Sequence, residues 1–193
     1  MSRNLIMLGM AILVVSLIVF IIIGFLSGIS NPLPWISMAI LAAVILMHNR
    51  IVKNRYLEWN ERYSVGIESI DNDHKKLIQL INNLQTAMDY KTDNVFEKQT
   101  LAEVIDYTKY HFAREEDLME KNDYSDFVAH KAQHEKMIAK VTELVEAYER
   151  DESEGIKSGA IESLLMYLKS WLIHHINGTD QEYSEYLISK GVK

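Results

Sequence analysis

Five histidines and two carboxylates beyond residue 73 have types and spacings that suit the binding of metal ions. They are His74, His111, Glu115, His130, His134, His175 and Asp180. His111 and Glu115 are four residues apart, so on a helix they project from one face about one turn apart. His130 and His134 have the same spacing. A single histidine in a helix is more often a hydrogen-bonded core residue, but the pattern of seven predicts a metal site.

Helix geometry decides between neighbouring side chains. Glu115 is preferred over Glu116 because a spacing of four residues keeps it on the histidine face of the helix, whereas five residues rotate it away. Asp180 lies five residues after His175, about 140° around a straight helix, so the two converge only if the backbone bends between them. Gly178 lies between them and makes such a bend cheap.

The number of candidate ligands predicts two metal ions. Five imidazoles and two carboxylates are too many for one ion, and a carboxylate can bridge two. With two bridging carboxylates and a bridging oxygen from water, three histidines fill one ion and two histidines leave the other with one vacancy, as an O2 site needs. The chain has no cysteine. Histidine and carboxylate suit iron best, and ligand type alone leaves manganese and zinc open.

The N-terminal segment differs in charge from the rest of the chain. Residues 1–55 contain no Asp or Glu, and their basic residues are Arg3, Arg50, Lys53 and Arg55. The whole chain has a net charge of −7, which leaves −11 on residues 56–193. We expect residues 1–55 to be a membrane anchor and residues 56–193 a separate domain. An acidic domain repels phosphate backbones, so no nucleic-acid partner is expected.

Two apolar runs predict a transmembrane hairpin. Residues 5–26 contain no charge and are long enough to cross about 30 Å of hydrocarbon as a helix. A second helix is expected at about residues 33–50, although its apolar part, which ends at Met47, covers only about 22 Å. A single anchor followed by an interfacial segment is therefore the alternative. A cleaved signal peptide is disfavoured because the first run is too long and no small-residue cleavage site follows it.

The basic residues predict the orientation of the hairpin. They flank its two outer ends, and the positive-inside rule keeps both ends, and hence the acidic domain, in the cytoplasm. We therefore expect a multi-pass protein of a bacterial inner membrane. Gly24 and Gly28 form a GxxxG motif, which predicts close helix packing either within one hairpin or in a homodimer.

Four amphipathic helices are predicted beyond the membrane segment, with apolar residues at helical spacing and no proline. The expected ranges are Ile70 to about Met88, Val95 to about Glu120, Asp126 to about Arg150, and Ile161 to about Leu187 with a break near Gly178. Asp71 is a plausible N-cap of the first. Short polar connections predict an all-α, antiparallel up-down four-helix bundle, preceded by the two transmembrane helices.

Four sequence motifs resemble those of the hemerythrin family, in the same order and over essentially all of residues 57–190. They are WNERYSVGIESIDNDH, which ends at His74, then HFAREE, HKAQH and WLIHHINGTDQEY. The resemblance is specific because it requires H, HxxxE, HxxxH and HxxxxD on four successive helices. The HxxxxD spacing selects His175 rather than His174, which is expected to be a surface residue.

The resemblance implies a role for each ligand. His130, His134 and His175 would bind a six-coordinate iron, and His74 and His111 the iron with the vacancy. Glu115 and Asp180 would bridge the two irons, and O2 would bind at the vacancy. The family's apolar O2 pocket would be formed by Leu77, Phe112, Trp171, Leu172 and Tyr183. Ordinary core packing is the alternative interpretation of these five residues.

Reversible O2 binding for delivery, storage or sensing at the inner face of the membrane is the function that these expectations favour. The expected partners are O2, the lipid bilayer and a membrane oxidase or another O2-consuming membrane protein. A di-iron enzyme, such as an oxidase, peroxidase or nitric-oxide reductase, is the alternative. Oxygen-activating di-iron bundles use more carboxylates and fewer histidines than this chain offers, which favours binding over catalysis.

Overall fold

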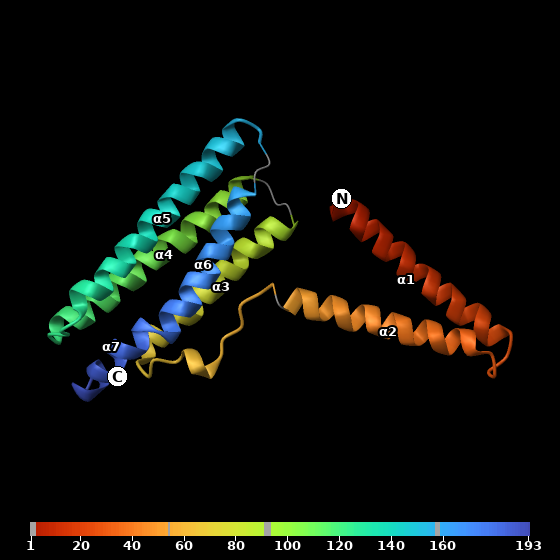
Figure 1. Ribbon diagram of the computed structural model, residues 1–193, viewed down its shortest axis with the longest axis horizontal. Helices are drawn as coiled ribbons and strands as arrows, with labels where there is room; N and C mark the ends of the chain where they lie inside the picture. The colour runs from red at the N-terminus through yellow and green to blue at the C-terminus, as the bar shows by residue number, and fades with distance from the viewer. Residues whose placement is uncertain (1–2, 54, 91–93, 157–158) are drawn as a thin grey trace. The chain divides into compact units, whose positions relative to one another are not determined.

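The computed structural model describes residues 3–53, 55–90, 94–156 and 159–193, and over these residues it is helical without any strand (Figure 1). The predicted all-α class is therefore confirmed. The elements are α1 (Arg3–Leu26), α2 (Pro32–Lys53), the short 3-10 helix η1 (Glu61–Tyr63), α3 (Glu68–Tyr90), α4 (Asn94–Lys121), α5 (Phe127–Ser153), α6 (Ala160–Asn177) and α7 (Thr179–Ser189). Contacts divide the chain into two compact units, Met1–Arg55 and Tyr56–Lys193.

The first unit is a hairpin of α1 and α2. Asn31 caps α2, because its Oδ1 accepts the Leu33 N–H at 2.9 Å, and Pro32 at the first helical position has no N–H to leave unpaired. The helices approach closely at Gly24, where a Cβ would lie 2.5 Å from Pro34 Cδ. Gly24 thus serves packing within the hairpin, and a homodimer through the GxxxG motif stays a prediction.

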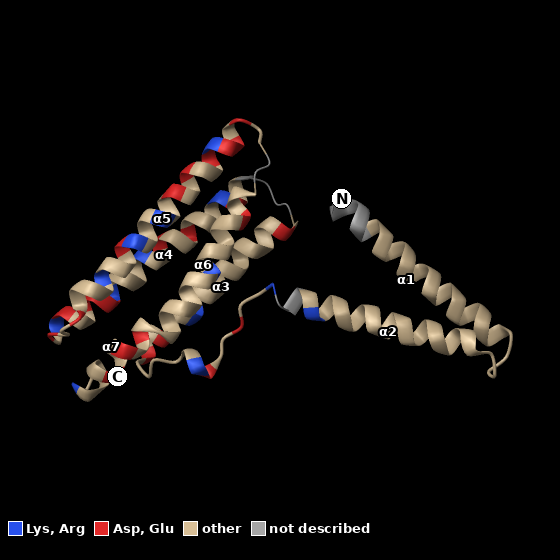
Figure 2. Ribbon diagram, viewed as in Figure 1, with Lys and Arg blue, Asp and Glu red and all other residues tan. Residues whose placement is uncertain are grey.

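Both hairpin helices are long and apolar enough to cross a membrane. Residues 8–26 have a mean hydropathy of 3.0 and residues 32–51 one of 1.5, and only 11% of each segment is buried. Because α2 continues to Lys53, it is longer than the apolar run that ends at Met47. The side chains of Arg3 and Lys53, which contribute to the predicted orientation, lie outside the described residues. Figure 2 shows how few charged residues the described part of the hairpin carries, in contrast to α3–α7.

The second unit is built around four helices that pack as a ring. Helix α3 contacts α4 and α6, and α5 contacts α4 and α6, while α7 adds a contact to α4. The helices begin and end close to their predicted bounds, and the predicted break falls at Gly178, between α6 and α7. This arrangement agrees with an up-down four-helix bundle.

The predicted N-cap of the first bundle helix was wrong. Helix α3 begins at Glu68, so Asp71 lies inside its first turn. The Asp71 carboxylate accepts the Val65 N–H at 2.8 Å and the Ser64 hydroxyl at 2.5 Å. It therefore fastens the segment before the helix to the helix itself, which single-sequence capping rules do not reveal.

The core of the bundle consists of two apolar clusters. The larger one contains residues from all four main helices, among them Leu77, Phe112, Met137 and Leu172. The smaller one consists of Val65, Ile67, Ile70, Met119, Tyr183 and Leu187. On α3, Ile70 and Leu77 belong to different clusters and stand one turn before and after His74. A polar layer at the level of His74 therefore lies between the two clusters.

Candidate metal centre

The seven predicted ligands all lie in the interior of the bundle, and none is more than 5% exposed. Helix α3 supplies His74, α4 supplies His111 and Glu115, α5 supplies His130 and His134, α6 supplies His175, and α7 supplies Asp180. Isolated polar side chains are rarely buried so completely, because each loses its hydration. Their common burial indicates that they serve one site.

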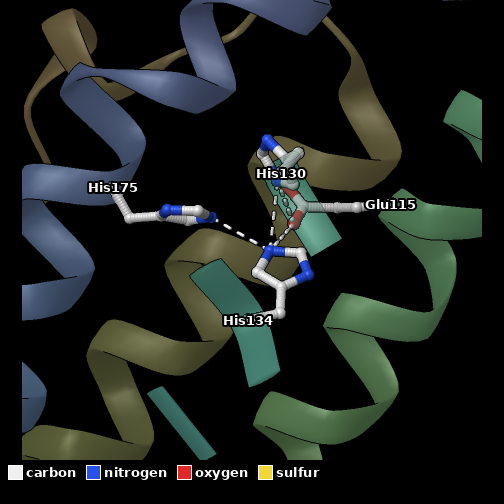
Figure 3. Close-up of side chains that lie close together, drawn as sticks. All are labelled: Glu115, His130, His134 and His175. Carbon is white, nitrogen blue, oxygen red and sulfur yellow. Dashed lines mark hydrogen bonds and ion pairs between the residues drawn. The ribbon is translucent and has the colours of Figure 1, made fainter. Parts of the chain in front are cut away.

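Three imidazoles meet at one point (Figure 3). His134 Nε2 lies 3.1 Å from His130 Nε2 and 3.0 Å from His175 Nε2. Two nitrogens bound at about 2.1 Å to one ion, at right angles to each other, are about 3.0 Å apart. The spacing of the three nitrogens therefore fits adjacent positions around a single metal ion.

Glu115 directs its two oxygens toward different histidines. Its Oε1 lies 3.5 Å from His111 Nε2 and 3.8 Å from His74 Nε2. Its Oε2 lies 3.3 Å from His134 Nε2 and 3.9 Å from His130 Nε2. A carboxylate placed in this way can give one oxygen to each of two ions.

Asp180 divides its oxygens in the same way. Its Oδ1 lies 3.0 Å from His175 Nε2 and 3.7 Å from His130 Nε2, and its Oδ2 lies 3.3 Å from His74 Nε2. The break at Gly178 makes this possible, because α6 ends and α7 begins there with the Gly178 N–H still bonded to the His175 carbonyl at 3.1 Å. The expected bend between His175 and Asp180 is present.

Two groups of potential ligands share Glu115. One consists of Glu115, His130, His134 and His175, and the other of His74, His111 and Glu115, with the ligand atoms of each group within 4.8 Å of one another. Asp180 belongs to neither group but reaches three of the histidines.

The unpaired atoms of the site fit bound cations. Among the described residues, every buried side-chain nitrogen or oxygen without a hydrogen-bond partner belongs to His74, His111, Glu115, Asp180 or the adjoining Asp73. Buried polar atoms without partners are costly. A set of imidazole and carboxylate donors with several of its atoms unpaired is suited to iron or a similar divalent ion.

The pKa values of the buried histidines and carboxylates show which positive charges a bound cation would replace. Burial opposes protonation of His74, but Asp180 and Glu115 raise its pKa to about 9. Burial also opposes ionisation of Glu115, yet the charge of His111 and hydrogen bonds from other histidines hold its pKa well below the ordinary value. Burial lowers the pKa of His175 to about 4 despite nearby Asp180. Protons on some imidazoles thus offset the buried carboxylates.

Residues missed by the sequence analysis hold two of the imidazole rings. Glu116 Oε1 lies 3.1 Å from His134 Nδ1, and Thr179 Oγ1 lies 2.9 Å from His175 Nδ1. Such contacts fix the orientation of a metal-binding ring. Glu116 lies five residues after His111 and therefore points away from the histidine face of α4, as predicted. Its side chain reaches His134 of α5 instead.

An apolar cavity of about 10 Å³ lies beside the polar layer. It is lined by Leu77, Ile81, Thr108, Phe112, Met137, Leu168, Trp171 and Leu172. The Trp171 ring stacks on His175 at a centroid distance of 4.1 Å, and the Phe112 ring stacks on His134 at 3.7 Å. Four of the five residues predicted for the O2 pocket therefore line this cavity.

Tyr183 differs from that prediction. It does not line the cavity but lies in the smaller apolar cluster, where its hydroxyl donates to Glu115 Oε1 at 2.5 Å. Burial and the negative charges of Glu115 and Asp180 raise its pKa well above the ordinary value, so it remains a donor. We assign it to orienting Glu115. His174, which was not chosen as a metal ligand, is exposed as expected, and its Nδ1 lies 2.6 Å from the Ser170 carbonyl.

Comparison with known proteins gives a consistent result. Residues 65–187 match the family model described as the hemerythrin HHE cation binding domain. Bacteriohemerythrin of Stenotrophomonas maltophilia is 34% identical over 129 residues, 67% of this chain and 80% of that protein. The hemerythrin-like protein of Naegleria gruberi is 30% identical over 65% of this chain and 88% of its own length. The crystal structure of wild-type hemerythrin superposes with a TM-score of 0.56 at 26% identity, covering 68% of this chain and 97% of that one.

Proposed function

The chain belongs to the hemerythrin family, and from that premise we propose that it binds O2 reversibly at a non-haem di-iron centre. The observation that carries the proposal is the division of the Glu115 and Asp180 oxygens between two sets of imidazoles. The function of such a site at a membrane is delivery, storage or sensing of O2.

The seven residues then have separate roles. His130, His134 and His175 would hold the iron with a full set of ligands, and His74 and His111 would hold the iron with the vacancy. Glu115 and Asp180 would bind both. Support comes from the contacts already described, in which each carboxylate faces both sets of histidines.

Two bound ferrous ions would supply the electrons and an open coordination position for O2. The protein contributes the surroundings. Tyr183 fixes the bridging Glu115 through its hydroxyl, and the residues next to His74 and His111 in space and sequence exclude water. Leu77 stands one turn after His74, and Phe112 follows His111 directly, with both side chains at the apolar cavity.

The size of the cavity favours a diatomic ligand over an organic substrate. A cavity of about 10 Å³ holds roughly one water-sized sphere, and apolar walls disfavour the release of charged oxygen species. A larger groove of about 410 Å³ lies between α4 and α5, and its lining includes His134, Glu116 and Phe112 but not His74 or His111. Because the only proposed ligand in this lining is His134, which is assigned to the filled iron, the groove gives the alternative, a di-iron oxidase acting on a larger substrate, less support.

We further propose that α1 and α2 anchor the site to a bacterial inner membrane, with the bundle in the cytoplasm. The exposed apolar surfaces of both helices support the anchor, and the flanking basic residues support the orientation. About ten residues connect the apolar part of α2 to the bundle, which keeps the site within tens of ångströms of the bilayer. A membrane oxidase or another O2-consuming membrane protein is the proposed partner.

The experiment that tests the function is O2 titration of the reduced full-length protein. The protein in detergent is loaded with iron, reduced without air, exposed to O2 and then flushed with argon while its visible absorption is recorded. We expect a charge-transfer band that appears with O2 and disappears under argon over several cycles. Immediate irreversible oxidation with release of peroxide would contradict reversible binding, and turnover of nitric oxide would support the enzyme alternative.

A further inference from the structure

Asp73, on α3, lies against the nitrogen of His111 that faces away from the bridging carboxylate. Asp73 Oδ2 is 3.6 Å from His111 Nδ1, while His111 Nε2 is 3.5 Å from Glu115 Oε1. Asp73 Oδ2 and His111 Nδ1 are both buried and have no hydrogen-bond partner. Their separation exceeds a hydrogen bond by only about half an ångström. A small rotation of the ring would therefore let His111 Nδ1 donate to Asp73 Oδ2, whose other close contact is the Arg114 guanidinium.

The Asp73 carboxylate is held in place by two residues of α4. Tyr107 donates its hydroxyl to Asp73 Oδ1 at 2.8 Å. Arg114 Nη1 lies 3.1 Å from both Asp73 oxygens and also donates to the Ser69 carbonyl at 3.3 Å. Asp73 is only 2% exposed, whereas the Arg114 side chain is 32% exposed, so the pair directs its negative end toward His111 inside the bundle.

The contact between Asp73 and His111 distinguishes the two irons of the proposed centre. His74, which shares the open iron with His111, has an Nδ1 that is buried without a partner. On the other iron, the carboxylate beside His134 belongs to Glu116, which is 20% exposed and paired with Lys131 at 3.0 Å. His175 faces the neutral hydroxyl of Thr179. A buried carboxylate thus supports a histidine of the open iron, whereas the carboxylate on the filled iron is partly hydrated.

We propose that Asp73 is a positioning residue for the open iron, which orients His111 and keeps O2 bound by adding negative charge behind that ligand. This inference rests on the proposed function and assigns a specific control of the same site. A carboxylate behind a metal-binding histidine fixes the ring and raises its basicity. Negative charge near iron favours the more oxidised state, and O2 binding draws electrons from the irons. The Asp73 charge therefore stabilises the O2-bound state relative to the reduced one.

Asp73→Asn tests the proposal, because asparagine has nearly the same shape but no charge, and its single oxygen can accept from only one of His111 and Tyr107. In the full-length iron-loaded protein we expect roughly tenfold faster O2 dissociation by stopped flow and a midpoint potential of the iron couple that shifts upward, measured without O2. Wild-type values of both quantities at full iron content would overturn the proposal. Failure of the wild-type protein to bind O2 would refute the proposed function. The midpoint potentials of the wild type and Asp73→Asn would still test the role of Asp73, because they are measured without O2.

Asp117→Asn is the matched control, since it makes the same change to an exposed carboxylate of α4 that pairs with Lys121 at 2.7 Å. We expect its O2 dissociation rate to stay within about threefold of wild type, because an exposed charge is screened by water. An effect equal to that of Asp73→Asn would show that any nearby charge acts alike and would refute the assignment to Asp73.

Tyr107→Phe is a second variant that tests the positioning role of Asp73 if Asp73→Asn does not load iron. It keeps every charge and removes one of the two groups that hold Asp73 Oδ1. We expect O2 dissociation to be a few-fold faster and the paramagnetically shifted N–H resonance of His111 to move, because the ring loses a fixed partner. Wild-type values of both would overturn the positioning role.

Discussion

The Nε2 atoms of His134 on α5 and His175 on α6 lie 3.0 Å apart inside the bundle. His134 Nε2 is also 3.1 Å from His130 Nε2, and one ring hydrogen cannot satisfy both contacts. Protein interiors avoid such unmatched polar contacts unless another group resolves them. A metal ion bound by the three Nε2 atoms would resolve both contacts.

The open iron depends on His74 in our assignment. We expect His74→Ala to abolish the O2-dependent absorption band, while iron bound by His130, His134 and His175 is retained in part. The control is His174→Ala, which alters an exposed neighbour of a ligand and should leave both iron content and O2 binding unchanged. Iron analysis and the O2 titration check both variants. Full O2 binding by His74→Ala would contradict the ligand assignment.

Trp171 shields the vacancy in the proposed site, since it lines the apolar cavity together with Leu77 and Phe112, the neighbours of His74 and His111. We expect Trp171→Ala to admit water and to speed the irreversible oxidation of the O2-bound protein by roughly tenfold. Loss of this large side chain should also lower the free energy of unfolding by about 3 kcal/mol. Trp171→Phe keeps a ring over His175 and should remain within about threefold of wild type. The decay of the oxygenated spectrum in air measures the effect, and equal decay in all three proteins would exclude shielding by Trp171.

The iron-free protein should be most stable near pH 6.5, the ordinary pKa of histidine. The pKa of His74 is raised to about 9 in the fold, so its contribution to stability is complete below pH 6.5 and is lost as the pH rises through 9. The pKa of His175 is lowered to about 4, so its contribution is complete above pH 6.5 and is lost as the pH falls toward 4. Urea unfolding of the iron-free bundle, followed by fluorescence between pH 4 and 9, measures this.

His74→Ala is also the control for the pH profile. It should reduce the alkaline part of the decline, to which His134, whose pKa is also raised by Glu115 and Glu116 despite its burial, contributes the rest, and it should keep the acidic part. A decline of the same size above pH 6.5 in that variant would mean that another group is responsible.

Most of the candidate site could be predicted from the sequence because ligand types and helical periodicity are local properties. A spacing of four residues places His111 with Glu115 on one face whatever the helix packs against. The same reasoning anticipated the bend at Gly178, since a straight helix could not bring His175 and Asp180 together.

The residues that hold the ligands could not be predicted in this way. Asp73 contacts Tyr107, 34 positions later, and that contact depends on how α3 and α4 are rotated about their axes. Tyr183 was placed in the O2 pocket by resemblance, but α7 starts anew after Gly178 and carries its side chain to the smaller apolar cluster. Contacts between helices are set by tertiary packing, which a single sequence does not specify.

The proposed orientation predicts a cytoplasmic C-terminus. A green fluorescent protein fused after Lys193 should be fluorescent, and alkaline phosphatase at the same point should be inactive, because each reporter works on one side of the membrane. Replacing Arg50, Lys53 and Arg55 with uncharged residues should weaken this preference, since positive charge determines it. Active alkaline phosphatase on the unmodified chain would overturn the cytoplasmic assignment.

The central claim is a centre of two irons with one vacancy, and the ratio of iron to bound O2 tests it most directly. Purified full-length protein is reconstituted with ferrous iron, its iron is counted per chain, and O2 uptake is titrated against the oxygenated absorption band. We predict two irons and one O2 per chain. A single iron per chain, or two irons that take up no O2 reversibly, would contradict the account.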